Sequence, residues 1–332
     1  MTLTLVIPGL LWPRQVMRDS LFDANFPALQ TLLGKGRISS PGHKSADEWW
    51  SAQFGIGNSL FAPAPLRLLA LGGKPDDSAW LCADPVHLEV NQRGAALKDP
   101  GLLAIDADEG RQLHATLAPL FADVGELVAT TPAHWHLRLK QNPPAMPGRL
   151  TDLVEQPATA LIPSGDAGRL WRQLINDCQI ALHSHAVNET RKSQRKTEIN
   201  SIALWGAGVL PTTVAGIDSM MQCDEAVIGG LAKSAGLHAH TVAERFAATN
   251  NDLLVHWDKL QIPSVSHDAL AWREALEHLE QDWIAPALAA VASGRLKKIE
   301  LHGFGEDESV SCTMRSLDRY CFWRNPRRLE TL

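Results

Sequence analysis

Apolar and polar positions follow two different periods along this chain of 332 residues. Short apolar, β-branched runs predict buried strands, and apolar positions three to four residues apart predict amphipathic helices. In the first and last thirds, the predicted strands are 3–7, 199–204, 237–242, 252–256 and 298–302. The predicted helices are 26–33, 225–234 and 266–293, the last of them irregular near Pro286. Strands that alternate with helices indicate βαβ units and a mostly parallel sheet.

The middle of the chain has a different pattern. Its predicted elements are strand-like stretches at 80–90 and 126–140, a helix at 108–121, and an amphipathic helix at 166–185 that continues into 188–196. We therefore predict an α/β fold, with helices on both faces of a mostly parallel sheet. Residues 1–72 and 198–332 are expected to form this core. Residues 73–197 are expected to form an inserted α+β domain, as a lid or substrate domain.

Residues 42–54 are predicted to be a loop that leads into a helix. Ser45 stands three residues before Glu48, which is the spacing of a helix capping box. The sequence therefore predicts that Ser45 is the N-cap of this helix.

Composition narrows the functional classes. Apolar residues make up 45% and charged residues 20% of the chain, which is typical of a globular protein. A formal net charge of −6 does not favour nucleic-acid binding. No stretch approaches the roughly 18 apolar residues of a membrane span, and the first residues lack the basic start of a signal peptide. We expect a cytoplasmic protein with neither a nucleic acid nor a membrane as partner.

The five cysteines do not form a recognisable framework. They are odd in number, scattered, and without a C-x-x-C pair: Cys82, Cys178, Cys223, Cys312 and Cys321. This spacing argues against a zinc site or a set of disulfides and favours reduced thiols in a cytoplasmic protein.

Several segments, in order, resemble one protein family. LVIPG followed by FPALQTLLGKGR resembles the opening strand and helix of the alkaline phosphatase superfamily, and IDADEGRQL resembles D-R-R-A-G-R-I. HSHAVNETRKSQRKTEINSIALWGAG resembles H-P-V-N-x-x-R…R-G-A-G, and its residues 185–208 are the most specific part of the resemblance. Over nearly its whole length the chain is similar to archaeal-type cofactor-independent phosphoglycerate mutases. Related bacterial proteins are often described as mutases, and some as regulators.

The resemblance implies an activity that moves a phosphoryl group between two hydroxyls of glycerate. It uses a serine nucleophile and two divalent metals, Mn or Zn, held by Asp and His. Ser45 is the best match to the nucleophile, although it is displaced from the pattern, and His267 and His302 match two metal ligands. Where the family has carboxylates, this chain has Pro8, Pro263 and Leu301. The resemblance therefore implies a metal site that is largely lost.

The resemblance also implies a substrate site that is only partly kept. Arg111, Asn188 and Arg191 match family positions that bind substrate. Ala107, Asp108 and Trp205 stand where the family has arginines, the residues that bind phosphate in bidentate fashion. For Asn188 and Arg191 a purely structural role within their helix-end region is an equally open interpretation.

Two hypotheses of function follow. In the first, the chain keeps the mutase-like fold, has lost metal-dependent phosphoryl transfer, needs no cofactor, and binds a phosphorylated small molecule or a protein partner as a binding or regulatory protein. In the second, it is an active mutase or phosphatase with Ser45 as nucleophile and a rearranged Mn or Zn site. The ligands of that site would be His267, His302 and nearby carboxylates, with Asp258, Asp268, Glu306 and Asp307 as candidates. A metal-free transferase is a third alternative, which no motif supports.

The end of the chain is basic and aromatic. It contains Phe322 and Trp323 among Arg315, Arg319, Arg324, Arg327 and Arg328. Such a segment is usually a solvated face, but the two aromatic residues make a docking role the alternative interpretation.

Overall fold

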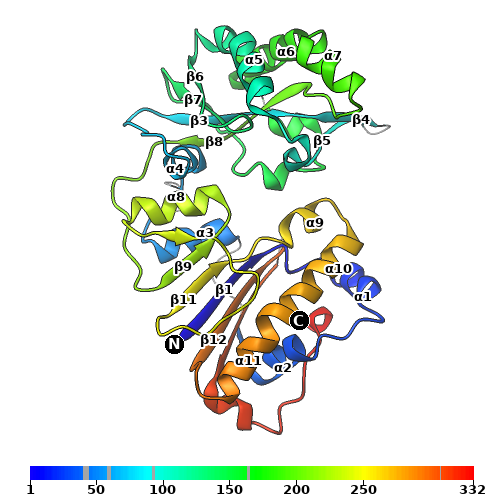
Figure 1. Ribbon diagram of the computed structural model, residues 1–332, viewed down its shortest axis with the longest axis vertical. Coiled ribbons are helices and arrows are strands. Elements are labelled where there is room, and N and C mark those ends of the chain that lie inside the picture. Colours follow the sequence, from blue (N-terminus) through cyan, green and yellow to red (C-terminus); the bar gives the residue numbers. More distant parts are fainter. Residues whose placement is uncertain (40–44, 58–60, 92–93, 163–164, 307) are drawn as a thin grey trace. The chain divides into compact units, whose positions relative to one another are not determined.

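The computed structural model of the protein describes residues 1–39, 45–57, 61–91, 94–162, 165–306 and 308–332 (Figure 1). The chain forms two compact units. Unit 1 contains residues 1–58 and 214–332, and unit 2 contains residues 59–213.

Unit 1 is built on a seven-stranded sheet with the order β10-β9-β11-β1-β12-β13-β2. The strands are β1 (Thr2–Pro8), β2 (Arg37–Ser39), β9 (Met220–Cys223), β10 (Ala239–His240), β11 (Leu253–His256), β12 (Lys298–Phe304) and β13 (Ser309–Arg315). β10, β9, β11, β1 and β12 are parallel, whereas β13 and β2 pair in antiparallel fashion at one edge. The predicted α/β class with a mostly parallel sheet is confirmed.

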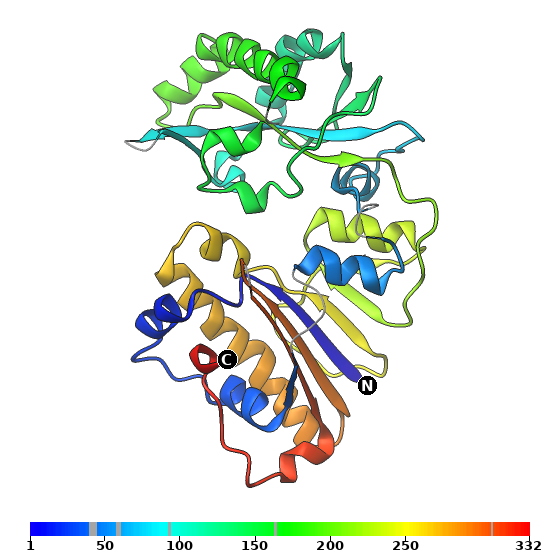
Figure 2. The same ribbon diagram turned by 180° about the vertical axis from the view of Figure 1, so that it is seen from behind.

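Helices lie on both faces of this sheet (Figures 1 and 2). They are α1 (Arg14–Ser20), α2 (Pro27–Lys35), α3 (Ala46–Gln53), α8 (Ala226–Ser234), α9 (Gln261–Val265), α10 (Ala269–His278) and α11 (Ala285–Ala292), with short turns η8 (Ser316–Tyr320) and η9 (Leu329–Thr331). A π-helical turn, η7 (Leu279–Ile284), separates α10 from α11. Pro286 follows it directly in α11, and the Asp282 carbonyl, four residues earlier, accepts the Phe246 amide at 2.8 Å in place of a helical N–H. The predicted irregularity near Pro286 is confirmed.

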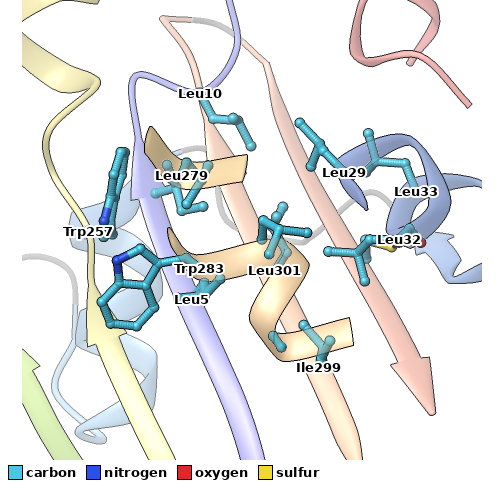
Figure 3. Packing of buried hydrophobic residues seen from close by; sticks show 14 of the residues in the cluster. Leu5, Leu10, Leu29, Leu32, Leu33, Trp257, Leu279, Trp283, Ile299 and Leu301 are labelled. Atoms are coloured by element: carbon cyan, nitrogen blue, oxygen red, sulfur yellow. Dashed lines mark hydrogen bonds between the residues drawn. The ribbon is translucent and has the colours of Figure 1, made fainter. Parts of the chain in front are cut away.

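A large hydrophobic cluster of unit 1 lies on one face of the sheet. Alternate residues of β1 and β12 point to this face because successive side chains of a strand alternate in direction. Figure 3 shows Leu5, Ile299 and Leu301 packed against Leu279 and Trp283 of η7 and against leucines of α2. All are buried, so η7 and α2 cover this face.

Unit 2 contains an antiparallel sheet with the order β6-β7-β3-β8 and a separate β4–β5 pair. Its strands are β3 (Trp80–Val86), β4 (Leu88–Asn91), β5 (Gly94–Leu97), β6 (Gly125–Ala129), β7 (Trp135–Leu139) and β8 (Ser201–Gly208). Its helices are α4 (Pro63–Ala70), α5 (Ala107–Leu117), α6 (Arg169–His183) and α7 (Ala186–Ser193), with 3-10 turns η2 (Pro100–Leu103), η3 (Ala118–Phe121), η4 (Thr151–Leu153), η5 (Ala158–Leu161) and η6 (Asp166–Gly168). A second hydrophobic cluster, made only from unit 2 residues, forms its core.

The structure differs from several predicted elements. The helix predicted at 166–196 is two helices, because His185 accepts a hydrogen bond from the Val187 amide and starts α7 afresh. The strand predicted at 237–242 is only β10, and β9, β13 and β2 were not predicted, although the sequence of β13, SVSCTMR, alternates polar and apolar residues as a strand does. The compact unit 2 spans 59–213, whereas the sequence placed the inserted segment at 73–197. Both α4 and β8 lie in unit 2, since β8 pairs along β3 and α4 packs against β8.

None of the helices that the structure describes combines the length and the apolarity needed to cross a bilayer.

Candidate functional site

A row of residues in register crosses the unit 1 sheet near the carboxyl ends of its parallel strands. Cys223, His256, Val6, His302 and Ser311 are successive partners on β9, β11, β1, β12 and β13. Partners in register point to the same face, here the face opposite to the apolar core. The two histidines flank β1, so their Cα atoms are about 10 Å apart at the usual strand spacing. We call these five residues the histidine row.

Helix α3 covers the histidine row with two indole rings. Trp50 Nε1 donates to His256 Nδ1 at 3.2 Å, and the His256 side chain is buried. The Trp49 ring lies against the His302 ring with 4.9 Å between centroids. His302 Nδ1 is also 2.7 Å from Ser311 Oγ. Each imidazole therefore uses Nδ1 in a hydrogen bond and has a tryptophan ring against it.

Ser45 begins the helix that carries these tryptophans. Its Oγ accepts a hydrogen bond from the Glu48 amide at 3.2 Å, so the predicted N-cap is confirmed. The Ser45 side chain is exposed. Residues 40–44, which complete the motif compared with the family's nucleophile segment, lie outside the described residues.

Carboxylates follow two of the parallel strands. Both oxygens of Glu225 accept backbone amides, those of Val227 and Ile228 at 3.0 Å each, and so cap α8. Asp224 accepts from the Val242 amide. Burial, together with the negative charges of Glu225 and Asp224, raises the pKa of Asp258 to about 6.

The other predicted ligands lie elsewhere in unit 1. His267 is exposed in the turn between α9 and α10, with a left-handed φ of 54°. Asp268 caps α10 by accepting from the Ala271 amide at 3.0 Å, and Asp307 lies outside the described residues. Over the part of the chain that the structure describes, no group of three or more His, Cys, Asp or Glu side chains is placed to hold a metal ion.

Sequence reasoning missed His256 and the two tryptophans that cover the row. His256 ends the run DLLVH, so a signal was present: a histidine in the last position of a buried parallel strand. Only the pairing of Val6 with both His256 and His302 shows that the two histidines share a face.

Two of the predicted substrate residues are buried in unit 2. The Asn188 amide group donates to Leu182 and Ile199 carbonyls, at 2.8 and 2.7 Å, and accepts from the Ile199 amide. Arg191 donates to Glu109 at 2.6 Å and to two backbone carbonyls. These contacts hold α7 against α5 and the entry of β8.

Arg111 lies apart from them, on the exposed surface of α5. Its guanidinium pairs with Asp108, three residues earlier, and both side chains are exposed. An exposed pair of this kind is screened by solvent and holds Arg111 only weakly in place.

A buried polar network, which the sequence did not predict, occupies the middle of unit 2. Arg67 forms a bidentate pair with Asp84, at 2.6 and 2.8 Å, and its Nε donates to His136 at 3.1 Å. Trp205 donates to Asp84 at 2.9 Å, and the Arg67 guanidinium lies 4.8 Å from the Trp205 ring centre. Trp205 thus takes part in an internal network.

The fold has counterparts among solved structures. The chain is similar to the cofactor-independent phosphoglycerate mutase from Thermoplasma acidophilum, with a TM-score of 0.51 and 13% identity, over 99% of this chain and 94% of that one. A protein from Pyrococcus horikoshii also matches, with a TM-score of 0.47 and 13% identity, over 95% of this chain and 87% of that one. No protein-family model matches, and no curated protein sequence matches. At this identity the likeness to the mutase shows the fold: a phosphoglycerate-mutase-like, alkaline-phosphatase-like α/β fold.

Proposed function

We propose that this protein keeps the mutase-like fold but has lost metal-dependent phosphoryl transfer, and that it acts as a binding or regulatory protein. The proposal is carried by one observation, the covering of the histidine row by Trp49 and Trp50.

The chemistry of the donor set supports the proposal. A pair of divalent ions needs several carboxylates and imidazoles whose lone pairs face an open position for substrate. The Trp50 N–H takes the Nδ1 lone pair of His256, and the indole rings have no lone pair to offer a metal. Pro8, two residues after Val6 on β1, stands where the family resemblance implies a carboxylate; Leu301, the other such position, packs into the apolar core on the opposite face of the sheet. The residues present fit two divalent cations poorly.

The ligand of such a protein would be a phosphorylated small molecule or a protein partner, and we place it in the cytoplasm. Support for a phosphorylated ligand comes only from the mutase-like fold, which the two hypotheses share.

One observation favours the alternative, an active mutase or phosphatase that uses Ser45. Ser45 is exposed at the N-terminus of α3, where the helix dipole stabilises a developing negative charge. A capping hydroxyl that accepts one backbone amide still has its own proton to lose.

The deciding experiment is purification with manganese present, followed by measurement of bound metal and of conversion of 3-phosphoglycerate to 2-phosphoglycerate. We expect neither stoichiometric metal nor turnover. Turnover that Ser45→Ala abolishes, together with bound metal, would overturn the proposal.

A matched control separates chemistry from stability in that case. Asp106 caps α5 by accepting two backbone amides, and it lies in unit 2. Asp106→Ala removes a cap without touching Ser45, so equal loss of turnover in both variants would indicate destabilisation rather than a lost nucleophile.

A further inference from the structure

A group of exposed apolar side chains follows β13, the last strand of unit 1, in η8 and the residues just after it. It consists of four large side chains within seven residues, exposed as follows: Leu317 76%, Tyr320 60%, Phe322 86% and Trp323 67%. The rings of Phe322 and Trp323 contact each other edge-on, with 5.2 Å between centroids. We call these four residues the tip; η8, which carries the first two, is drawn in red at the end of β13 in Figures 1 and 2.

The tip is held in place by hydrogen bonds on both sides. The Ser316 amide donates to the Lys297 carbonyl at 2.9 Å, and the buried Asp318 carboxylate accepts the Arg315 amide at 2.8 Å. Arg319 donates to backbone carbonyls at the carboxyl end of α11. The exposure of the tip therefore belongs to an ordered turn, so presenting these side chains costs little further conformational entropy.

Cations surround the tip. Residues 309–329 contain five arginines and one acid, Asp318, so this stretch carries a net charge of +4 in a chain whose net charge is −6. Tertiary contacts add two lysines: Lys35 Nζ donates to the Arg319 carbonyl at 2.9 Å, and Lys297 lies beside Ser316. The cationic rim consists of Lys35, Lys297, Arg315, Arg319 and Arg324.

From this combination we infer that the tip and its cationic rim dock this protein onto an anionic phospholipid surface. Leucine and aromatic side chains partition into the boundary between headgroups and acyl chains, and each nearby Lys or Arg adds attraction to anionic headgroups. The remainder of the chain is acidic and would be repelled by such a surface, so the charges also select which end approaches.

The expectation from the sequence of no membrane partner rested on the lack of an apolar span, and interfacial docking requires no such span.

The test is flotation of the full-length protein with vesicles of phosphatidylcholine alone or with roughly one-third phosphatidylglycerol. We expect binding to the anionic vesicles, little binding to the neutral ones, and release at high salt. The double variant Phe322→Ser/Trp323→Ser should weaken binding by about tenfold or more, since it removes most of the apolar surface that enters the lipid. Lys297→Gln/Arg315→Gln should weaken binding only to anionic vesicles.

Leu270→Ser is the matched control, because Leu270 is equally exposed, at 69%, but lies on α10 of the same unit. It should bind as the unaltered protein does, and circular dichroism should show all variants folded. Binding that ignores phosphatidylglycerol, or that survives Phe322→Ser/Trp323→Ser, overturns the inference. So does binding of polyglutamate, lost in that variant, without vesicle binding, since this result assigns the tip to an acidic protein partner. These outcomes are independent of metal content and turnover.

Discussion

Asp84 lies at the centre of the buried network of unit 2 and accepts four hydrogen bonds, two of them from Arg67. Burial alone raises the pKa of Asp84, but the charge and hydrogen bonds of Arg67 more than offset it, so the pKa lies below its usual value. The pair is therefore ionised, and each charge depends on the other.

Asp84→Ala is expected to cost about 3–5 kcal/mol in the free energy of unfolding, because it leaves the buried Arg67 charge without its partner. Urea denaturation measures this. Asp76→Ala, which breaks the exposed pair with Arg138, is the matched control and should cost much less, because solvent screens that pair. Equal losses of stability in Asp84→Ala and Asp76→Ala would contradict the idea that burial makes the Arg67–Asp84 pair more important than the exposed pair.

His136 makes the stability of this network depend on pH. Arg67 Nε is a donor, so His136 Nε2 accepts and Nδ1–H donates to Thr130 Oγ1 at 2.8 Å. Burial and the nearby Arg67 charge lower the pKa of His136 from 6.5 to about 3. The folded protein thus keeps this ring neutral where the unfolded chain protonates it.

The free energy of unfolding should therefore fall as the pH falls below 6.5 towards 3, with about 3 kcal/mol lost to His136 by about pH 4.5. The His136→Gln side chain can accept and donate hydrogen bonds but does not titrate. The free energy of unfolding of this variant should therefore fall by about 3 kcal/mol less over that range. His183→Gln, at an exposed histidine, should follow the unaltered protein. The same pH dependence in His136→Gln and the unaltered protein would rule the mechanism out.

At the scale of elements, a helix or strand could be predicted from the sequence where its signal lay within a few neighbouring residues. Helix α2 and the cap of α3 were predictable, because apolar spacing and a capping serine act within a few residues. Strands β9 and β2, of four and three residues, exist through pairing with partners distant in the chain. Their sequences alone therefore carried little information.

Ser45→Ala is expected to destabilise the protein by about 1 kcal/mol, because it removes the hydrogen bond to the Glu48 amide at the start of α3. Ser45→Asp should preserve stability, since aspartate is an equally good N-cap and its charge suits the helix dipole. Thermal unfolding of both variants measures this. A large loss in Ser45→Asp would show that Ser45 has contacts beyond the cap.

At the scale of the whole molecule, each unit contains a hydrophobic cluster made only of its own residues. A unit with its own core and its own hydrogen-bonded sheet meets the requirements for folding alone.

We therefore expect the fragment 59–213, expressed by itself, to unfold cooperatively and to keep the aromatic circular dichroism of buried tryptophans. The control fragment is 73–197, which lacks α4 and β8. It loses Arg67 and Trp205, leaves Asp84 buried without its partners, and should not fold. An unfolded 59–213 fragment, or a folded 73–197 fragment, would contradict this division.

What the sequence determined by itself was the class of fold, the cap of α3 and the segments that resemble the mutase family. These depend on period, local hydrogen bonding and order along the chain. The sequence also identified His302 as a candidate residue, but it did not predict the contacts of His302 with Trp49 and Ser311.

Only the tertiary structure decided what the candidate residues touch. It paired Val6 with both His256 and His302, covered the row with α3, and satisfied Asn188 and Arg191 internally. The physical reason is that a side chain's chemistry depends on its neighbours in space. In a parallel sheet those neighbours come from strands that are far apart in the chain.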